Sequence, residues 1–159
     1  MKILQVCPRY YPDVGGVEEH VRNISERLVK KYDVTVFTTD PSGKLPKQEV
    51  INGVEIRRFK SWAPNEAYYF SRELKEYLIK DSDSFDIVHT HNYHAFPALY
   101  VAQVKGRSKL IFAPHYHGKG HGFLRNLLHV PYKFLGKIIL TRADKIVCVS
   151  NYEKNLIAN

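Results

Sequence analysis

Residues 1–40 read MKILQVCPRYYPDVGGVEEHVRNISERLVKKYDVTVFTTD, and this stretch decides the fold. It holds two short apolar runs, at 3–7 and 34–38, of strand length and without a clean polar alternation. Between the two runs, apolar residues recur at helical spacing, at Val17, Val21, Ile24 and Leu28. A strand, a helix and a strand in so short a segment form a βαβ unit, which predicts a parallel sheet covered on both faces.

The same alternation continues along the chain. We expect further strands and helices at these places: strands at 86–91, 109–113 and 145–149, helices at 65–80, 95–104 and 122–142, and a last helix from Asn151. Asn52-Gly53 between two apolar segments predicts a β-hairpin. The predicted fold class is therefore α/β, a Rossmann-like and mostly parallel sheet with helices on both faces, in one domain spanning 1–159.

Composition narrows the class of protein. The chain has 24 Lys and Arg against 16 Asp and Glu, a net charge of +8, and its excess of cations lies in 105–145. Any anionic partner should meet that half, but no recognised nucleic-acid motif accompanies the charge, so we expect no nucleic-acid partner. Cys7 and Cys148 lie in apolar runs and are expected to be small core residues in a reducing compartment. No apolar stretch reaches the roughly 18 residues of a spanning helix, which favours a cytoplasmic protein.

Residues with useful chemistry follow the predicted strands, at the edge of the sheet where such folds bind ligands. Gly15-Gly16 opens the first predicted helix, where exposed amides and the helix dipole favour a phosphate. His89 and His91 lie two residues apart on a predicted strand and so share one face. The loop 114–122 contains three histidines and three glycines. A tight turn or a structural hydrogen bond explains any one of these residues, but the cluster predicts a site.

Five short motifs occur in an order that is typical of one enzyme family. They are Gly15-Gly16-Val17-Glu18, the hairpin at Asn52-Gly53, Asp86-Ile87-Val88-His89-Thr90-His91, Pro114-His115-Tyr116-His117-Gly118 and Ala143-Asp144-Lys145-Ile146-Val147-Cys148-Val149-Ser150. Together they resemble the N-terminal domain of a family 4 (group 1) retaining glycosyltransferase of the GT-B fold. The resemblance spans essentially the whole chain.

The resemblance implies a two-domain hexosyltransferase. In such enzymes the N-terminal domain binds the acceptor, and a C-terminal Rossmann-like domain holds the nucleotide-sugar donor. The resemblance implies these site residues: Gly15 and Gly16 at the donor diphosphate, His115 as the catalytic residue beside the transferred sugar, and Arg9, Tyr10, Glu18, His91 and His117 on the acceptor side. It also implies transfer with retention and no metal or other cofactor. Because the sequence stops at Asn159, we expect the C-terminal domain to be absent and this domain alone to be inactive.

Two carboxylate patterns are discounted. Asp81-Ser82-Asp83 matches the metal-binding Asp-x-Asp of some sugar transferases, but it precedes a strand and therefore falls at the opposite end of the sheet. Glu18 and Glu26 have the spacing of a glutamate pair found in many glycosyltransferases, yet both fall on the first predicted helix. We expect a solvated turn in the first case and a helix surface in the second.

Other functions stay open at this point. His89, His91, His115 and His117 could hold a catalytic zinc, which would make the protein a zinc-dependent hydrolase, although no Asp or Glu lies in these loops to serve as a base. A non-catalytic module that binds an acceptor or a lipid is a third reading. The basic segment 122–142 is either a helix that covers the sheet or a surface that contacts anionic lipid at the inner membrane face.

Overall fold

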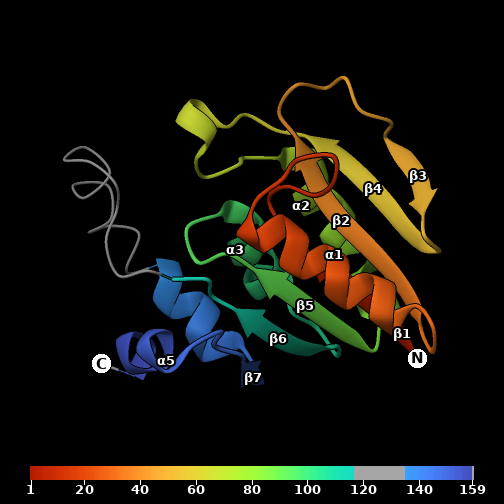
Figure 1. The fold of residues 1–159 in the computed structure, drawn as a ribbon. Helices are drawn as coiled ribbons and strands as arrows, with labels where there is room; N and C mark the ends of the chain where they lie inside the picture. The colour runs from red at the N-terminus through yellow and green to blue at the C-terminus, as the bar shows by residue number, and fades with distance from the viewer. Residues whose placement is uncertain (117–134, 159) are drawn as a thin grey trace.

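The computed structural model describes residues 1–116 and 135–158, which form one sheet with helices on both faces (Figure 1). The strands are β1 Lys2–Val6, β2 Asp33–Asp40, β3 Gln48–Ile51, β4 Val54–Lys60, β5 Ile87–His91, β6 Lys109–Ala113 and β7 Lys145–Ile146. They lie side by side in the order β3-β4-β2-β1-β5-β6-β7. The pair β3–β4 is antiparallel, and the other neighbouring pairs are parallel. The Rossmann-like α/β fold expected from the sequence is confirmed.

Helices connect the strands. They are α1 Gly16–Leu28, α2 Arg72–Asp81, α3 Phe96–Val104 and α5 Asn151–Ala158, with short 3-10 turns η1 Pro64–Glu66 and η2 Ser82–Ser84. Residues 135–142 are also helical. In Figure 1, α1 lies in front of the sheet, and α2 and α3 lie behind it.

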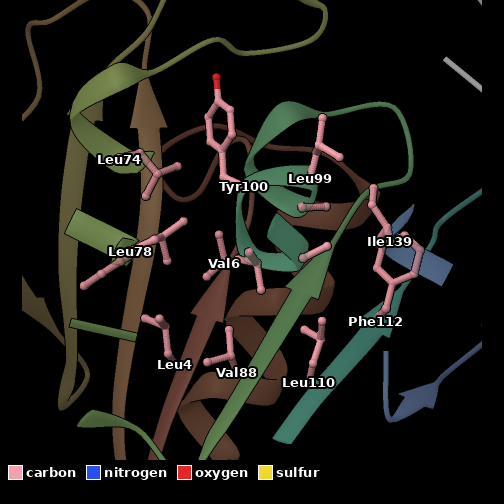
Figure 2. Close-up of a cluster of buried hydrophobic side chains, with 14 of the residues drawn as sticks. Leu4, Val6, Leu74, Leu78, Val88, Leu99, Tyr100, Leu110, Phe112 and Ile139 are labelled. Atoms are coloured by element: carbon pink, nitrogen blue, oxygen red, sulfur yellow. The ribbon is translucent and has the colours of Figure 1, made fainter. Parts of the chain in front are cut away.

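The core has one layer on each face of the sheet, because successive strand residues point to opposite sides. From β1, Leu4 and Val6 join the cluster under α2 and α3, as Figure 2 shows. Ile3 and Cys7 join the smaller cluster under α1. This alternation places Gln5, which lies between Ile3 and Cys7 in β1, on the face that α1 covers.

The helix expected over 65–80 begins only at Arg72. Ser71 caps it, since its hydroxyl accepts the backbone N–H of Leu74 at 3.2 Å. Upstream, Phe70 exchanges backbone hydrogen bonds with Trp62 at 2.8 and 2.9 Å, and several residues before it have positive φ angles. The apolar residues of the segment have helical spacing. However, the backbone N–H and C=O groups of Phe70 are already bonded to Trp62, so they cannot form the hydrogen bonds of a helix.

The second half of the chain follows the prediction in part. The strand expected at 145–149 is shorter than predicted and ends at Ile146. Both cysteines are free thiols. Ile139 of the helical residues 135–142 is fully buried against the core, so this part of the basic segment covers the sheet as one of the two readings proposed. Residues 122–134 lie outside the described residues. In the part of the chain that the structure describes, no helix is long and apolar enough to cross a bilayer.

Candidate functional site

The predicted site residues come from three strand ends that meet at one edge of the sheet. In the parallel register, Val6 of β1 pairs with Thr90 of β5, and His91 of β5 pairs with Ala113 of β6. The chain segments that follow these strands therefore leave the sheet together. Gly15-Gly16 comes after β1, His91 ends β5, and His115 follows β6. His117 lies outside the described residues.

A chain of polar contacts links Gln5, His91 and His115. The Nε2 atom of His91 lies 2.8 Å from the Oε1 atom of Gln5, and its Nδ1 atom lies 3.2 Å from the Nε2 atom of His115. The rings of His91 and His115 are stacked, with centroids 5.5 Å apart. Gln5 and His91 are both completely buried. These contacts join β1, β5 and the segment after β6 in one side-chain cluster.

His20 and His89 complete this histidine cluster. The ring of His20, from α1, meets the ring of His115 edge to face at 5.0 Å, and the ring of His89 lies 4.1 Å from that of His91. Neither His20 nor Gln5 was among the residues predicted for the site. Gln5 was detectable as the polar residue inside the apolar run 3–7, and His20 as the residue one helical turn after Gly16.

Burial keeps the inner histidines neutral. It lowers the pKa of His89 to about 4, with a further small effect from the neighbouring His20 and His115. Burial likewise lowers the pKa of His91 well below its usual value of 6.5, and the three other rings add to this effect. Both rings are therefore uncharged at neutral pH. Among the residues that the structure describes, the buried Nε2 atom of His89 has no hydrogen-bond partner.

The backbone at His115 is held in an unusual conformation. Its φ is +50°, in the left-handed region that a residue with a side chain rarely adopts. The flanking residues are tied down, because Tyr93 N–H donates to Pro114 O at 2.7 Å and Tyr116 N–H donates to the carboxylate of Glu153 at 2.6 Å. Such conformations persist where the surroundings enforce them, and they occur often at functional sites.

Gly15 and Gly16 differ in what surrounds them. A methyl group on Gly15 would overlap the carboxylate of Glu18, which folds back over it. A methyl group on Gly16 would have nothing within 4 Å, and Gly16 is exposed. Packing within the described chain therefore explains the small residue at 15 but not at 16. The first turn of α1 leaves backbone N–H groups available for a ligand at this open position.

The predicted acceptor residues separate into two groups. Arg9 Nε donates to Glu18 at 2.9 Å, and Arg9 also lies 3.6 Å from the carboxylate of Glu66. The Arg9 side chain remains 30% exposed, so it can meet a ligand. The ring of Tyr10 instead packs in the core under α1, only 2% exposed, and burial raises its pKa. The ring of Tyr10 therefore fills the layer beneath α1, and its place among the acceptor residues stays a prediction.

The two discounted carboxylate patterns have structural roles. Asp83 accepts the backbone N–H of Arg107 at 2.9 Å, at the amino ends of the strands and so away from the histidines. The carboxylate of Glu26 accepts hydrogen bonds from the side chains of Arg22 and Asn52, each at 2.9 Å. The bond to Asn52 connects α1 to the turn between β3 and β4.

One group of residues in 1–116 and 135–158 has the spacing of a metal site. His20, His91 and His115 have ligating atoms within 4.8 Å of one another. This group differs from the four histidines considered from the sequence, since it contains His20 and lacks His89. Its closest pair of nitrogens is already at hydrogen-bond distance.

An open, mostly parallel sheet with a glycine-initiated helix and a polar cluster at its carboxyl edge defines a Rossmann-like domain. The profile of Glycosyltransferase Family 4 matches residues 14–159, and the chain belongs to this family. It is 32% identical over 151 residues to an uncharacterised glycosyltransferase of Methanocaldococcus jannaschii, covering 92% of this chain and 40% of that protein. It is 26% identical to a GDP-mannose:cellobiosyl-diphosphopolyprenol alpha-mannosyltransferase of Komagataeibacter xylinus, covering 98% of this chain and 40% of that protein.

A third relative and one solved structure extend the comparison. The GPI3 subunit of phosphatidylinositol N-acetylglucosaminyltransferase of Saccharomyces cerevisiae is 24% identical, over 94% of this chain and 34% of that protein. Sucrose-phosphate synthase of Thermosynechococcus elongatus has a similar fold, with a TM-score of 0.69 and 16% identity over 99% of this chain and 45% of that chain. The chain thus spans less than half of these proteins and corresponds to the N-terminal part of the GT-B fold. Nothing in these comparisons supports a zinc-dependent hydrolase.

Proposed function

We propose that this chain is the acceptor-binding half of a retaining glycosyltransferase that moves a hexose from a nucleotide-sugar donor to an acceptor. The contact between His20 and His115 carries this proposal. His20 lies one helical turn after Gly16 on the same face of α1, and its ring meets that of His115 at 5.0 Å. An anion at the N-terminus of α1 would therefore lie close to His115.

Each part of the site has a chemical role in this proposal. The backbone amide at Gly16, with Gly15 beside it, would donate to the donor diphosphate as negative charge develops on the leaving group. His115 would contact the transferred sugar and support the transition state. Fixed amides meet the charge of the leaving group, so the proposed reaction uses no divalent metal or other cofactor.

The acceptor would approach from the side of Arg9 and Glu18. Their ion pair offers a cation and a carboxylate, both suited to hydroxyl and phosphate groups. The names of two relatives specify lipid-linked acceptors, a diphosphopolyprenol and a phosphatidylinositol. We propose an acceptor of the same class, a saccharide or headgroup carried on a membrane lipid, which implies peripheral contact of a cytoplasmic enzyme with the inner membrane face.

We further propose that this chain alone does not turn over. A donor site in a GT-B enzyme needs a second Rossmann-like domain across the cleft, so one half supplies the acceptor side and a single wall of the donor site. Turnover by the chain alone would instead identify it as a complete enzyme.

A transfer assay tests the proposal. The chain is incubated with radiolabelled nucleotide sugars and a lipid extract, alone and joined to the C-terminal domain of a family relative, and labelled lipid is counted. We expect label only with the joined protein. Gly16→Ala keeps the backbone N–H but places a methyl group where the diphosphate would approach, and this displacement should reduce transfer about 100-fold. Asn23→Ala, on the exposed side of α1, should leave transfer unchanged. Full transfer by the Gly16→Ala protein, or turnover by the chain alone, would contradict the proposal.

A further inference from the structure

We infer that Gln5 and His91 act as a positioning pair that holds His115 in a single tautomer, with the proton on its Nε2 atom. The inference rests on two contacts in series. The Oε1 atom of Gln5 lies 2.8 Å from His91 Nε2, and His91 Nδ1 lies 3.2 Å from His115 Nε2.

The direction of the chain follows from what each atom can donate. The amide of Gln5 is oriented with its Oε1 atom toward His91, and a carbonyl oxygen only accepts, so in this orientation the Nε2 atom of His91 carries the hydrogen. A neutral imidazole has one N–H, so the Nδ1 atom of His91 is then a bare acceptor. The Nε2 atom of His115 must donate to it. Of the two tautomers open to a neutral His115, this chain of hydrogen bonds selects one.

Burial makes that selection strict. Gln5 and His91 are fully buried, so water cannot replace either hydrogen bond. An apolar residue at position 5 would suit the layer of Ile3 and Cys7 on the same face of β1. The glutamine interrupts that layer where it can reach His91. Two further rings pack against the two linked histidines. The ring of His20 meets that of His115, and the ring of His89 meets that of His91.

This inference rests on the proposed function only for the role of His115 in transfer. Gln5 and His91 act through His115 and are positioning residues. A ring held in one tautomer and one orientation presents the same atoms to the sugar at every turnover, so no reorganisation is needed as charge develops. The backbone restraint at Glu153 and Tyr116 fixes the same residue from the other side.

Nuclear magnetic resonance of the 159-residue chain tests the tautomer without any substrate. Long-range proton–nitrogen correlations on ¹⁵N-histidine protein should show Nε2–H for both His91 and His115. Gln5→Leu should remove this preference and move the imidazole signals of both residues. Thr90→Val is the matched control, because Thr90 lies beside His91 in β5, and its hydroxyl bonds Val6 O on the strand next to it.

Two results would overturn the inference. The first is an Nδ1–H tautomer for His91 in the unmodified chain, a measurement that needs no variant to fold. The second is an unchanged pattern in folded Gln5→Leu protein. In the joined two-domain protein, Gln5→Leu should lower kcat about tenfold or more with little change in the donor KM, and a wild-type kcat would refute the role in transfer. Absence of transfer in the unmodified joined protein contradicts the proposed function and leaves the tautomer result intact.

Discussion

The carboxylate of Glu153 accepts the backbone N–H of Tyr116 at 2.6 Å, across 37 positions of sequence. Its second oxygen accepts the N–H of Val149 at 2.7 Å, and its own N–H donates to Ser150 Oγ at 3.1 Å. The first turn of α5 is thereby tied both to Val149, in the segment between β7 and α5, and to the residue after His115. The hydroxyl of Ser150 caps α5, and the buried carboxylate of Glu153 joins this helix start to the residue after the candidate catalytic residue.

Glu153→Ala is expected to lower the free energy of unfolding by about 2 kcal/mol, because two part-buried N–H groups lose a charged acceptor. Urea denaturation followed by circular dichroism measures this change. Glu76→Gln is the control, since its ion pair with Arg72 is exposed on one helix face and is expected to contribute less than about 0.5 kcal/mol. Equal losses from the two substitutions would contradict the role assigned to Glu153.

Stability should fall in mild acid because of the buried histidines. His89 has a folded pKa of about 4 against 6.5 in the unfolded chain. Below pH 6.5 the unfolded state takes up a proton that the folded state does not, so the unfolding free energy decreases as the pH falls from 6.5 to 4. For His89 the loss amounts to about 3 kcal/mol at pH 4, and His91 acts in the same direction.

Urea titrations at several pH values between 7 and 4 check this slope. His89→Leu removes one of the two buried histidines and should make the decrease of the unfolding free energy with falling pH less steep. Some decrease should remain, because His91 is still present. A wild-type chain whose stability does not change between pH 6.5 and 4.5 would show that these rings are not buried as neutral groups.

The two glycines at the start of α1 should respond oppositely to alanine. Gly15→Ala forces the Glu18 carboxylate away from Arg9 and should destabilise the chain by about 1 kcal/mol. Gly16→Ala meets open space at a helical position, so stability should stay within about 0.5 kcal/mol of the original or rise. Thermal and urea denaturation of the pair measure the difference. Marked destabilisation by Gly16→Ala would assign that glycine to folding rather than to a ligand.

Metal removal is expected to have no effect. The closest nitrogens of His91 and His115 satisfy one another, so the group with His20 has no need of an ion. Treatment with EDTA should leave the melting temperature unchanged, and equimolar Zn²⁺ should not raise it. Stoichiometric zinc in the purified chain, or a melting temperature raised by several degrees with Zn²⁺, would contradict this prediction and support a zinc site.

The sequence predicted the sheet well because its signals are local. The apolar runs that became β1, β2, β5 and β6 are of strand length, and Asn52-Gly53 supplied the positive φ values that its turn requires. The helix over 65–80 was placed wrongly at its start, since the Trp62–Phe70 bridge is a pairing between separate segments. Residue spacing along one segment carries no information about such a bridge.

That the strand-end residues cluster was predictable for a similar reason. Residues at strand ends, such as His91 and His115, follow from topology, because parallel strands end at one edge. Gln5, His20 and Glu153 act through contacts across the fold, and the local signals at Gln5 and His20 do not say which residues they contact. The ring of Tyr10 packs with residues of α1, β1 and β2, and these contacts between segments are likewise not visible in the sequence around it.

The pairing of Gln5 with His89 in the register of β1 and β5 has a consequence for folding. A slip of one residue between these parallel strands would turn Gln5, or both strand histidines, toward the apolar layer under α2 and α3. The unsatisfied polar groups would then cost several kcal/mol, which penalises the shifted arrangement. The polar residues proposed to position His115 thus also disfavour sheets with a shifted register. Replacing them with apolar residues should allow a fraction of the chains to fold with the wrong register.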